Sequence, residues 1–149
     1  MPNLSLRTWT STLLLASLAA CSGMGGWSGM GMDKPMAAEL RLTGDQEVPA
    51  NDSKAVGTGR ITVGADGSVS GSVAAPTLQA MAAHIHVGAP GVNGPVIIPL
   101  TGSEGGVWSV PAGAKLTAEQ MDAYKAGNLY VNIHTAEHKG GEIRTQLKP

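Results

Sequence analysis

The sequence predicts an all-β domain, either a β-sandwich or a Greek-key barrel, with one short helix at about residues 117–126. From residue 37 onward, short runs of alternating apolar and polar residues recur, and alternation with period two is typical of strands with one buried face. Glycine is abundant, with 21 of 149 residues, and falls between these runs. Phe is absent, so the core must come from Val, Ile, Leu and Ala with a few aromatic residues. About eight short strands joined by glycine turns favour a sandwich or a barrel.

The expected strands follow one another along the whole domain. Residues 39–43 alternate, and the runs 57–63 and 68–73 flank an Asp66-Gly67 turn, which is a hairpin signal. Further strands are expected at residues 82–87, 96–100, 107–110, 129–134 and 142–147. The glycine-rich stretch 102–106 is not followed by a helix, so it predicts a turn rather than a phosphate-binding loop.

The single helix is predicted from its ends. Thr117 and Gln120 form a capping box, with Thr117 at the N-cap and Gln120 at the third helical position. Met121 and Tyr124 then share one face, and Gly127 occupies the position that ends a helix. Neither a Ser-His-Asp order nor a nucleotide-binding fingerprint occurs in the sequence, so no catalytic residue is assigned.

The N-terminus has the pattern of an export signal. Arg7 is followed by the apolar run 13–20, which is shorter than the roughly 20 apolar residues that span a bilayer. Cys21 comes directly after Leu18-Ala19-Ala20, and this resembles the lipobox of bacterial lipoproteins. We therefore expect residues 1–20 to be a lipoprotein signal peptide and Cys21 to carry the lipid. Cys21 is the only cysteine, and acylation accounts for a single thiol in an exported protein.

Residues 21–36 are rich in Gly and Met and predict a flexible tether between the lipid and a domain at residues 37–149. Ser22 rather than Asp follows Cys21, and resemblance to Gram-negative lipoprotein sorting then implies an outer-membrane lipoprotein that faces the periplasm or the cell surface. Without Arg7 the chain has nine Lys and Arg residues against eleven Asp and Glu residues, a net charge of about −2. This balance gives no basic surface for nucleic acid.

The four histidines fall in two groups, His84 with His86 and His134 with His138. On a strand, residues i and i+2 point to the same side, so His84 and His86 project together while Ile85 faces the core. In the later strand, His134 shares a face with Tyr130 and Asn132. If the two strands are neighbours, three or four imidazoles converge in a polar cleft or on the outer face.

Converging imidazoles predict a transition-metal site, because neutral imidazole binds Cu, Zn, Fe and Ni. We expect His84, His86, His134 and His138 to be the ligands, with Glu137 as an optional carboxylate ligand. Copper is favoured over zinc, because methionine thioethers suit Cu(I) and the tether contains four methionines. These are Met24, Met30, Met32 and Met36.

The stretch from about residue 38 to residue 147 resembles the CHRD domain, first named in chordin. The matching motifs are Gln46-Glu-Val-Pro49, Ala83-His-Ile-His86, Tyr130-Val-Asn-Ile-His-Thr135 and Gly140-Gly-Glu-Ile-Arg144. Thr145 replaces the glycine that usually ends the last motif. The resemblance implies an immunoglobulin-like β-barrel and a polar network beside the histidines, in which Glu142 and Arg144 pair with each other or with Glu47. The network residues are Glu47, Asn132, Glu142 and Arg144.

Two other functions fit the same sequence. In the first, the protein is an envelope adhesion or interaction module, the histidines are structural, and the extracellular binding role of chordin relatives is the guide. In the second, the protein is a copper-dependent enzyme similar to superoxide dismutase, which also carries a His-x-His pair among its copper ligands. This chain lacks the dismutase's disulfide and bridging-histidine loop. A non-enzymatic metal-binding lipoprotein is the interpretation that the sequence favours.

Overall fold

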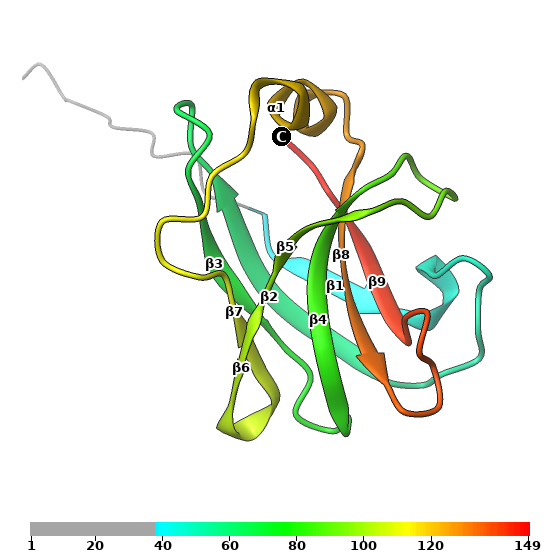
Figure 1. Ribbon diagram of the computed structural model, residues 1–149. Coiled ribbons are helices and arrows are strands. Elements are labelled where there is room, and N and C mark those ends of the chain that lie inside the picture. Colours follow the sequence, from blue (N-terminus) through cyan, green and yellow to red (C-terminus); the bar gives the residue numbers. More distant parts are fainter. Residues whose placement is uncertain (1–37) are drawn as a thin grey trace, which may run out of the picture. The chain divides into compact units, whose positions relative to one another are not determined.

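Residues 38–149 form nine antiparallel strands in a nearly closed barrel with one short helix, as the computed structural model in Figure 1 shows. The structure describes these residues only. The predicted signal peptide at residues 1–20, the predicted lipid attachment at Cys21 and the predicted tether at residues 21–36 lie outside the described residues. The predicted all-β class is confirmed, and the architecture is a barrel made from one continuous sheet.

Nine strands, one α-helix and two 3₁₀ turns make up the described part of the chain. The strands are β1 (Leu40–Thr43), β2 (Val56–Val63), β3 (Val69–Ala74), β4 (Ala80–Val87), β5 (Val96–Pro99), β6 (Thr101–Ser103), β7 (Val107–Ser109), β8 (Leu129–Thr135) and β9 (Ile143–Leu147). The helix α1 spans Ala118–Lys125, and the two 3₁₀ turns lie at Gly44–Gln46 and Glu104–Gly106.

The sheet closes because its two edge strands are consecutive in the chain. The strand order is β5-β4-β8-β9-β1-β2-β3-β7-β6, so β5 and β6 are the edges. Only Leu100 separates them in the sequence, and its N–H donates to the carbonyl of Ala83 on β4 at 2.9 Å. The chain therefore passes directly from one edge of the sheet to the other, which leaves little of either edge open to another strand.

Aliphatic side chains fill the barrel, as the absence of Phe predicts. Leu42, Val131, Ile133 and Ile143 are fully buried, and Ile85 is 1% exposed. These residues come from β1, β4, β8 and β9, which are neighbours in the sheet. The predicted inward direction of Ile85 is confirmed, and Val131 and Ile133 of β8 point into the same core.

Two loops cover the outer face of the barrel at β8, and they enclose polar side chains of that strand. Tyr130 and Asn132 lie on that outer face, yet each is only 2% exposed. The segments 44–53 and 88–95 lie over this face, since Gly94 bonds to Tyr130 and Glu47 is buried beside Asn132. Polar residues of β8 are thus enclosed between the sheet and two loops.

The helix forms where the sequence predicts it. The Thr117 hydroxyl accepts from the Gln120 N–H at 3.3 Å, and the Gln120 side chain accepts from the Thr117 N–H at 2.9 Å, so the capping box is complete. Gly127 follows the helix with a φ of 73°, a backbone conformation that glycine adopts without strain. Within residues 38–149, no helix is long and apolar enough to cross a membrane.

The turn predicted at residues 102–106 is partly wrong. Gly102 and Ser103 belong to β6, which pairs with β7, and only residues 104–106 turn. All three residues of β6 are exposed, so neither face carries the alternation that reveals a strand. β6 is a strand because it forms a hairpin with β7, and the side chains of β6 do not predict a strand.

Replacing a core residue of β8 should destabilise the barrel strongly. Ile133→Ala removes a fully buried side chain and leaves a cavity, so we expect a loss of about 2–5 kcal/mol in the free energy of unfolding. Urea denaturation of residues 37–149 measures this loss. Val96→Ala is the matched control, because Val96 is 47% exposed and should change stability by less than about 0.5 kcal/mol. Equal losses in the two variants would contradict the assigned core.

Candidate metal centre

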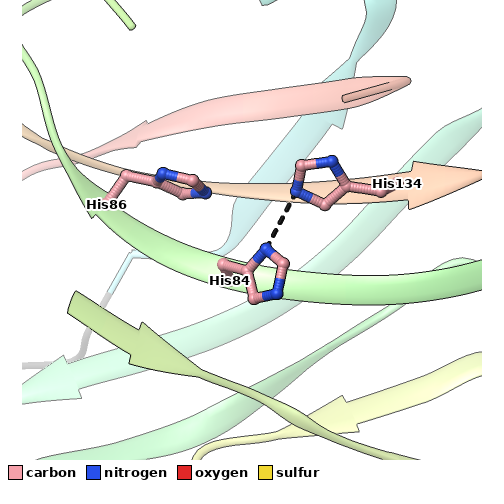
Figure 2. Close-up of side chains that lie close together, drawn as sticks. All are labelled: His84, His86 and His134. Carbon is pink, nitrogen blue, oxygen red and sulfur yellow. Dashed lines mark hydrogen bonds between the residues drawn. The ribbon is translucent and has the colours of Figure 1, made fainter. Parts of the chain in front are cut away.

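Three of the four histidines meet because β4 and β8 are antiparallel neighbours. In their register, His84 is paired with Asn132, His86 with Tyr130, and Ala82 with His134. One ring nitrogen from each of His84, His86 and His134 lies within 4.8 Å of the others, and Figure 2 shows the three rings facing one another. The predicted convergence of the two histidine groups is therefore present for these three residues.

Hydrogen bonds to two loops fix the orientation of two of the rings. His86 Nδ1 lies 2.9 Å from the carbonyl oxygen of Gly94, and His134 Nδ1 lies 3.0 Å from that of Lys139. A carbonyl oxygen only accepts, so both Nδ1 atoms carry the proton and both Nε2 atoms have a free lone pair when the ring is neutral. Metal-binding histidines commonly donate their second nitrogen to a carbonyl in this way.

The two Nε2 atoms differ in what they contact. His134 Nε2 lies 3.0 Å from His84 Nδ1 and accepts a hydrogen bond from its N–H (Figure 2). His86 Nε2 is buried and has no hydrogen-bond partner within 3.5 Å, although the Asn132 side chain lies close enough to raise the pKa of the ring. An unpaired buried polar atom costs about 1–3 kcal/mol. The lone pair of His86 is therefore available to a ligand that the protein itself does not supply.

All three imidazoles favour the neutral form. Burial lowers the pKa of His84, and the neighbouring His134 and His86 lower it further by charge repulsion. Burial likewise lowers the pKa of His86 and of His134, against the effect of their carbonyl partners. Neutral imidazole is the form that binds a metal ion. The environment thus prepares the rings for coordination at neutral pH.

The donor set fits a transition-metal ion. Zinc and similar ions bind imidazole nitrogen at about 2.0–2.1 Å, so two ligands on one ion lie at most about 4.2 Å apart. Ring nitrogens within 4.8 Å of one another reach this spacing after side-chain movements of a few tenths of an ångström. His84 and His134 are only half-buried, which gives an ion a path from solvent.

The sequence reasoning missed the residue that packs most closely on His86. Tyr130 is stacked on the His86 ring, with centroids 4.7 Å apart and an angle of 5° between the planes. Its hydroxyl accepts from the N–H of Gly94, whose carbonyl holds His86 Nδ1. A Cβ on Gly94 would overlap the carbonyl oxygen of Val87, so this loop needs glycine there. The position of Tyr130 two residues before Asn132 on the same strand face was the available signal.

The predicted supporting residues Glu47 and Asn132 lie next to the histidines. Glu47 is 5% exposed and Asn132 is 2% exposed, and Glu47 Oε1 and Asn132 Oδ1 have no hydrogen-bond partner. Burial raises the pKa of Glu47, which the charge of Arg144 partly opposes. A Cβ on Gly141 would overlap the Glu47 carboxylate, and the φ of Gly141 is 134°. Glycine at this position lets the backbone approach the carboxylate.

Glu142 has a different role from the one expected. Its carboxylate accepts from Ser53 Oγ at 2.7 Å and from Thr135 Oγ1 at 2.6 Å, so it ties the 44–55 loop to β8. Among the residues 38–149, ion pairs within 4.0 Å join Lys115 to Asp66 and Lys125 to Asp122 only. Arg144 therefore forms no direct ion pair with Glu142 or Glu47, although its charge and that of Glu47 act on each other.

The other two candidate ligands lie away from the three rings. His138 is outside the group whose nitrogens converge, and it lies in the loop after β8, where its N–H donates to Thr135 Oγ1 at 3.2 Å. Glu137 is exposed and lines a surface hollow with Leu78 and Gln79. The structure brings together His84, His86 and His134 and places neither His138 nor Glu137 with them.

Comparison with known proteins identifies the fold family. The family model of the CHRD domain matches residues 39–147. The chain belongs to the CHRD domain family. No curated protein and no solved structure matches it. In this CHRD domain, the His-Ile-His and Tyr-Val-Asn-Ile-His-Thr motifs are the paired segments of β4 and β8 that hold the three imidazoles.

The lowered histidine pKa values predict a pH dependence of the metal-free domain. The unfolded chain has imidazoles with a pKa near 6.5, so it takes up protons before the folded domain does as the pH falls. The stability from these residues is therefore complete above pH 6.5 and decreases below it, until the folded pKa values are passed. Urea denaturation between pH 7.5 and pH 5 measures the decrease.

NMR titration of the imidazole resonances checks the same prediction residue by residue. This measurement is needed because the raised pKa of Glu47 changes the stability in the opposite sense. The stability that Glu47 contributes is present below its unfolded pKa of 4.5 and is lost as the pH rises through its folded pKa. Ring pKa values at or above 6.5 for His84, His86 and His134 would contradict the described environment.

Proposed function

We propose that this CHRD domain binds a transition-metal ion, copper before zinc, through His84, His86 and His134. The observation that carries the proposal is the buried Nε2 of His86, which has a free lone pair directed away from its carbonyl partner and no partner of its own. The lowered pKa values of all three rings support it, because they keep the nitrogens unprotonated at neutral pH. The half-buried His84 and His134 leave the ions a route of entry.

The choice of copper rests on the donor set and on the methionines that precede the domain. Three imidazoles without a carboxylate or a thiolate suit Cu(I), Cu(II) and Zn(II) more than Ca²⁺ or Mg²⁺, which require oxygen ligands. Affinity for divalent ions rises toward Cu²⁺ and falls again at Zn²⁺. The methionines of the segment before the domain add soft ligands that favour Cu(I).

The proposed place of action is the outer membrane, where a lipid on Cys21 would hold the domain at the periplasmic or the outer surface. The support is the sequence pattern of an apolar run, Leu18-Ala19-Ala20 and then Cys21, together with the single thiol. Two or more acyl chains give stable anchoring, since each buried CH₂ contributes about 0.8 kcal/mol. A metal-binding domain tethered there would collect or hold copper at the cell envelope.

Removing one ligand should abolish tight metal binding. Titration calorimetry of residues 37–149 with Cu(II) and Zn(II) should give one ion per domain with a dissociation constant below about 10 μM. His86→Ala should weaken binding at least about 100-fold, because it removes one of three ligands. His138→Ala is the matched control, since His138 lies outside the converging group. Binding above that limit in the wild type, or binding unaffected in His86→Ala, would end the proposal. A loss of stability without any metal effect would favour the interaction module.

Removing the thiol should release the protein from the membrane. Cys21→Ala in the full chain takes away the atom that would be acylated, so the protein should move from the membrane fraction to the soluble fraction of the expressing bacterium. Labelling with a radioactive or clickable fatty acid should mark the wild type and not the variant. Ser22→Ala is the control that keeps the thiol. Membrane association of Cys21→Ala equal to that of the wild type would contradict lipid anchoring.

A further inference from the structure

A buried arginine lies close to the histidine cluster, with one aromatic ring between them. Arg144 on β9 is 1% exposed, and its guanidinium carbon lies 3.4 Å from the centre of the Tyr130 ring. Tyr130 on β8 is in turn stacked on His86 of β4, at 4.7 Å and 5°. Since β4 and β9 are the two neighbours of β8, the cation and the imidazole approach the ring from opposite strands.

The charge of Arg144 is held by neutral groups. Its Nη2 donates to the carbonyl oxygens of Ala89 and Val92 at 3.3 and 3.1 Å and to Gln146 Oε1 at 3.3 Å, and its Nη1 donates to Asn93 Oδ1 at 3.3 Å. Within residues 38–149 no carboxylate pairs with it within 4.0 Å. A guanidinium stays protonated in proteins, so this is a fixed positive charge.

A buried carboxyl group, that of Glu47, lies near this cation. Burial raises the pKa of Glu47, and the charge of Arg144 lowers it. Arg144 and Glu47 also line a hollow of about 270 Å³ with Asp45, Gln46 and residues 90–91. Asp45 is exposed, so water screens its charge. The guanidinium lies on the Tyr130 ring that stacks on His86, so Arg144 is a charge that faces the histidine cluster through this ring.

A fixed positive charge near a metal site acts differently on ions of different charge. In a buried region the interaction between two charges is several times stronger than in water. A divalent ion at the three imidazoles is repelled twice as strongly as a monovalent one. The guanidinium carbon lies 3.4 Å from the centre of the Tyr130 ring, whose centroid lies 4.7 Å from that of His86, so the field of Arg144 reaches this ligand.

We propose that Arg144, acting across the Tyr130–His86 stack, biases the three-histidine site toward Cu(I) and against Cu(II) and Zn(II). Arg144 does not bind the ion itself; it is a positioning and electrostatic residue. The proposal rests on the proposed function of the site, and it specifies the ion that the site retains. A site with this bias raises the potential of bound copper, because the reduced ion is bound more tightly than the oxidised one.

The test compares the affinities of three ions in variants of Arg144. Arg144→Met removes the charge and keeps an unbranched chain, and Arg144→Lys keeps the charge. We expect the ratio of Cu(II) affinity to Cu(I) affinity to rise about tenfold in Arg144→Met, which corresponds to a potential about 59 mV lower. The ratio should stay within about threefold of the wild type in Arg144→Lys. The ratio of Zn(II) to Cu(I) affinity should rise with that of Cu(II).

Chromophoric chelator competition under anaerobic conditions gives the Cu(I) affinity, and calorimetry gives those of Cu(II) and Zn(II). If Arg144 had a purely structural role, Arg144→Met would weaken the binding of all three ions by the same factor. The affinity ratios would then stay unchanged, and this result would overturn the proposal. Arg41→Met is the matched control, because Arg41 is an exposed residue of β1. An equal change of the ratio in Arg41→Met would also overturn it.

A second variant keeps the test decisive if Arg144→Met does not fold. Asn93 is exposed and accepts from Arg144 Nη1, so Asn93→Asp adds a carboxylate against the guanidinium and leaves Arg144 in place. The Cu(II) to Cu(I) ratio should rise about two- to threefold, less than in Arg144→Met because water screens an exposed carboxylate. An unchanged ratio would overturn the inference. A wild type that binds none of the three ions would instead overturn the proposed function.

Discussion

The antiparallel register between β4 and β8 is the constraint on which the rest of the site depends. It pairs His84 with Asn132 and His86 with Tyr130, so that residues about 50 positions apart in the chain share one patch of the outer face. A slip of one residue would turn either the histidines of β4 inward or the aliphatic side chains of β8 outward. The buried Ile85, Val131 and Ile133 prevent such a slip, because the barrel interior needs them. The same apolar alternation that fills the core therefore fixes the geometry of the imidazoles.

Much of this arrangement could be predicted from the sequence, because the strands and the helix carry local signals. Alternation shows which side of β8 faces the core, and Thr117 and Gln120 define the start of the helix. The i, i+2 spacing of His84 and His86 places them on one face. Which strands are neighbours is a non-local property, so the sequence predicted the convergence of the two histidine groups only on the condition that their strands pair. His138 is only four residues after His134 in the sequence, but it lies in the loop beyond the end of β8. Closeness in sequence therefore did not predict that it would lie apart from the three rings.

The covering loops carry the part of the site that strand patterns could not predict. The carbonyl of Gly94 orients His86, and the carbonyl of Lys139 orients His134. A backbone carbonyl belongs to every residue, so no residue type in the sequence marks these two as hydrogen-bond partners. The expected ion pair of Arg144 failed for a related reason. Charge alone suggested a carboxylate partner, whereas the 88–95 loop supplies two carbonyl oxygens and an amide oxygen instead.

The buried polar atoms separate a metal-binding role from a purely structural one. Histidines that only support a fold normally use both nitrogens in hydrogen bonds, because an unpaired buried polar group costs about 1–3 kcal/mol. Within residues 38–149, four buried side-chain atoms have no partner: Glu47 Oε1, His86 Nε2, Trp108 Nε1 and Asn132 Oδ1. Three of them belong to Glu47, His86 and Asn132, which lie together beneath the same two loops. A cation bound to His86 would remove one of these unpaired acceptors, so the domain would be more stable with its ion than without it.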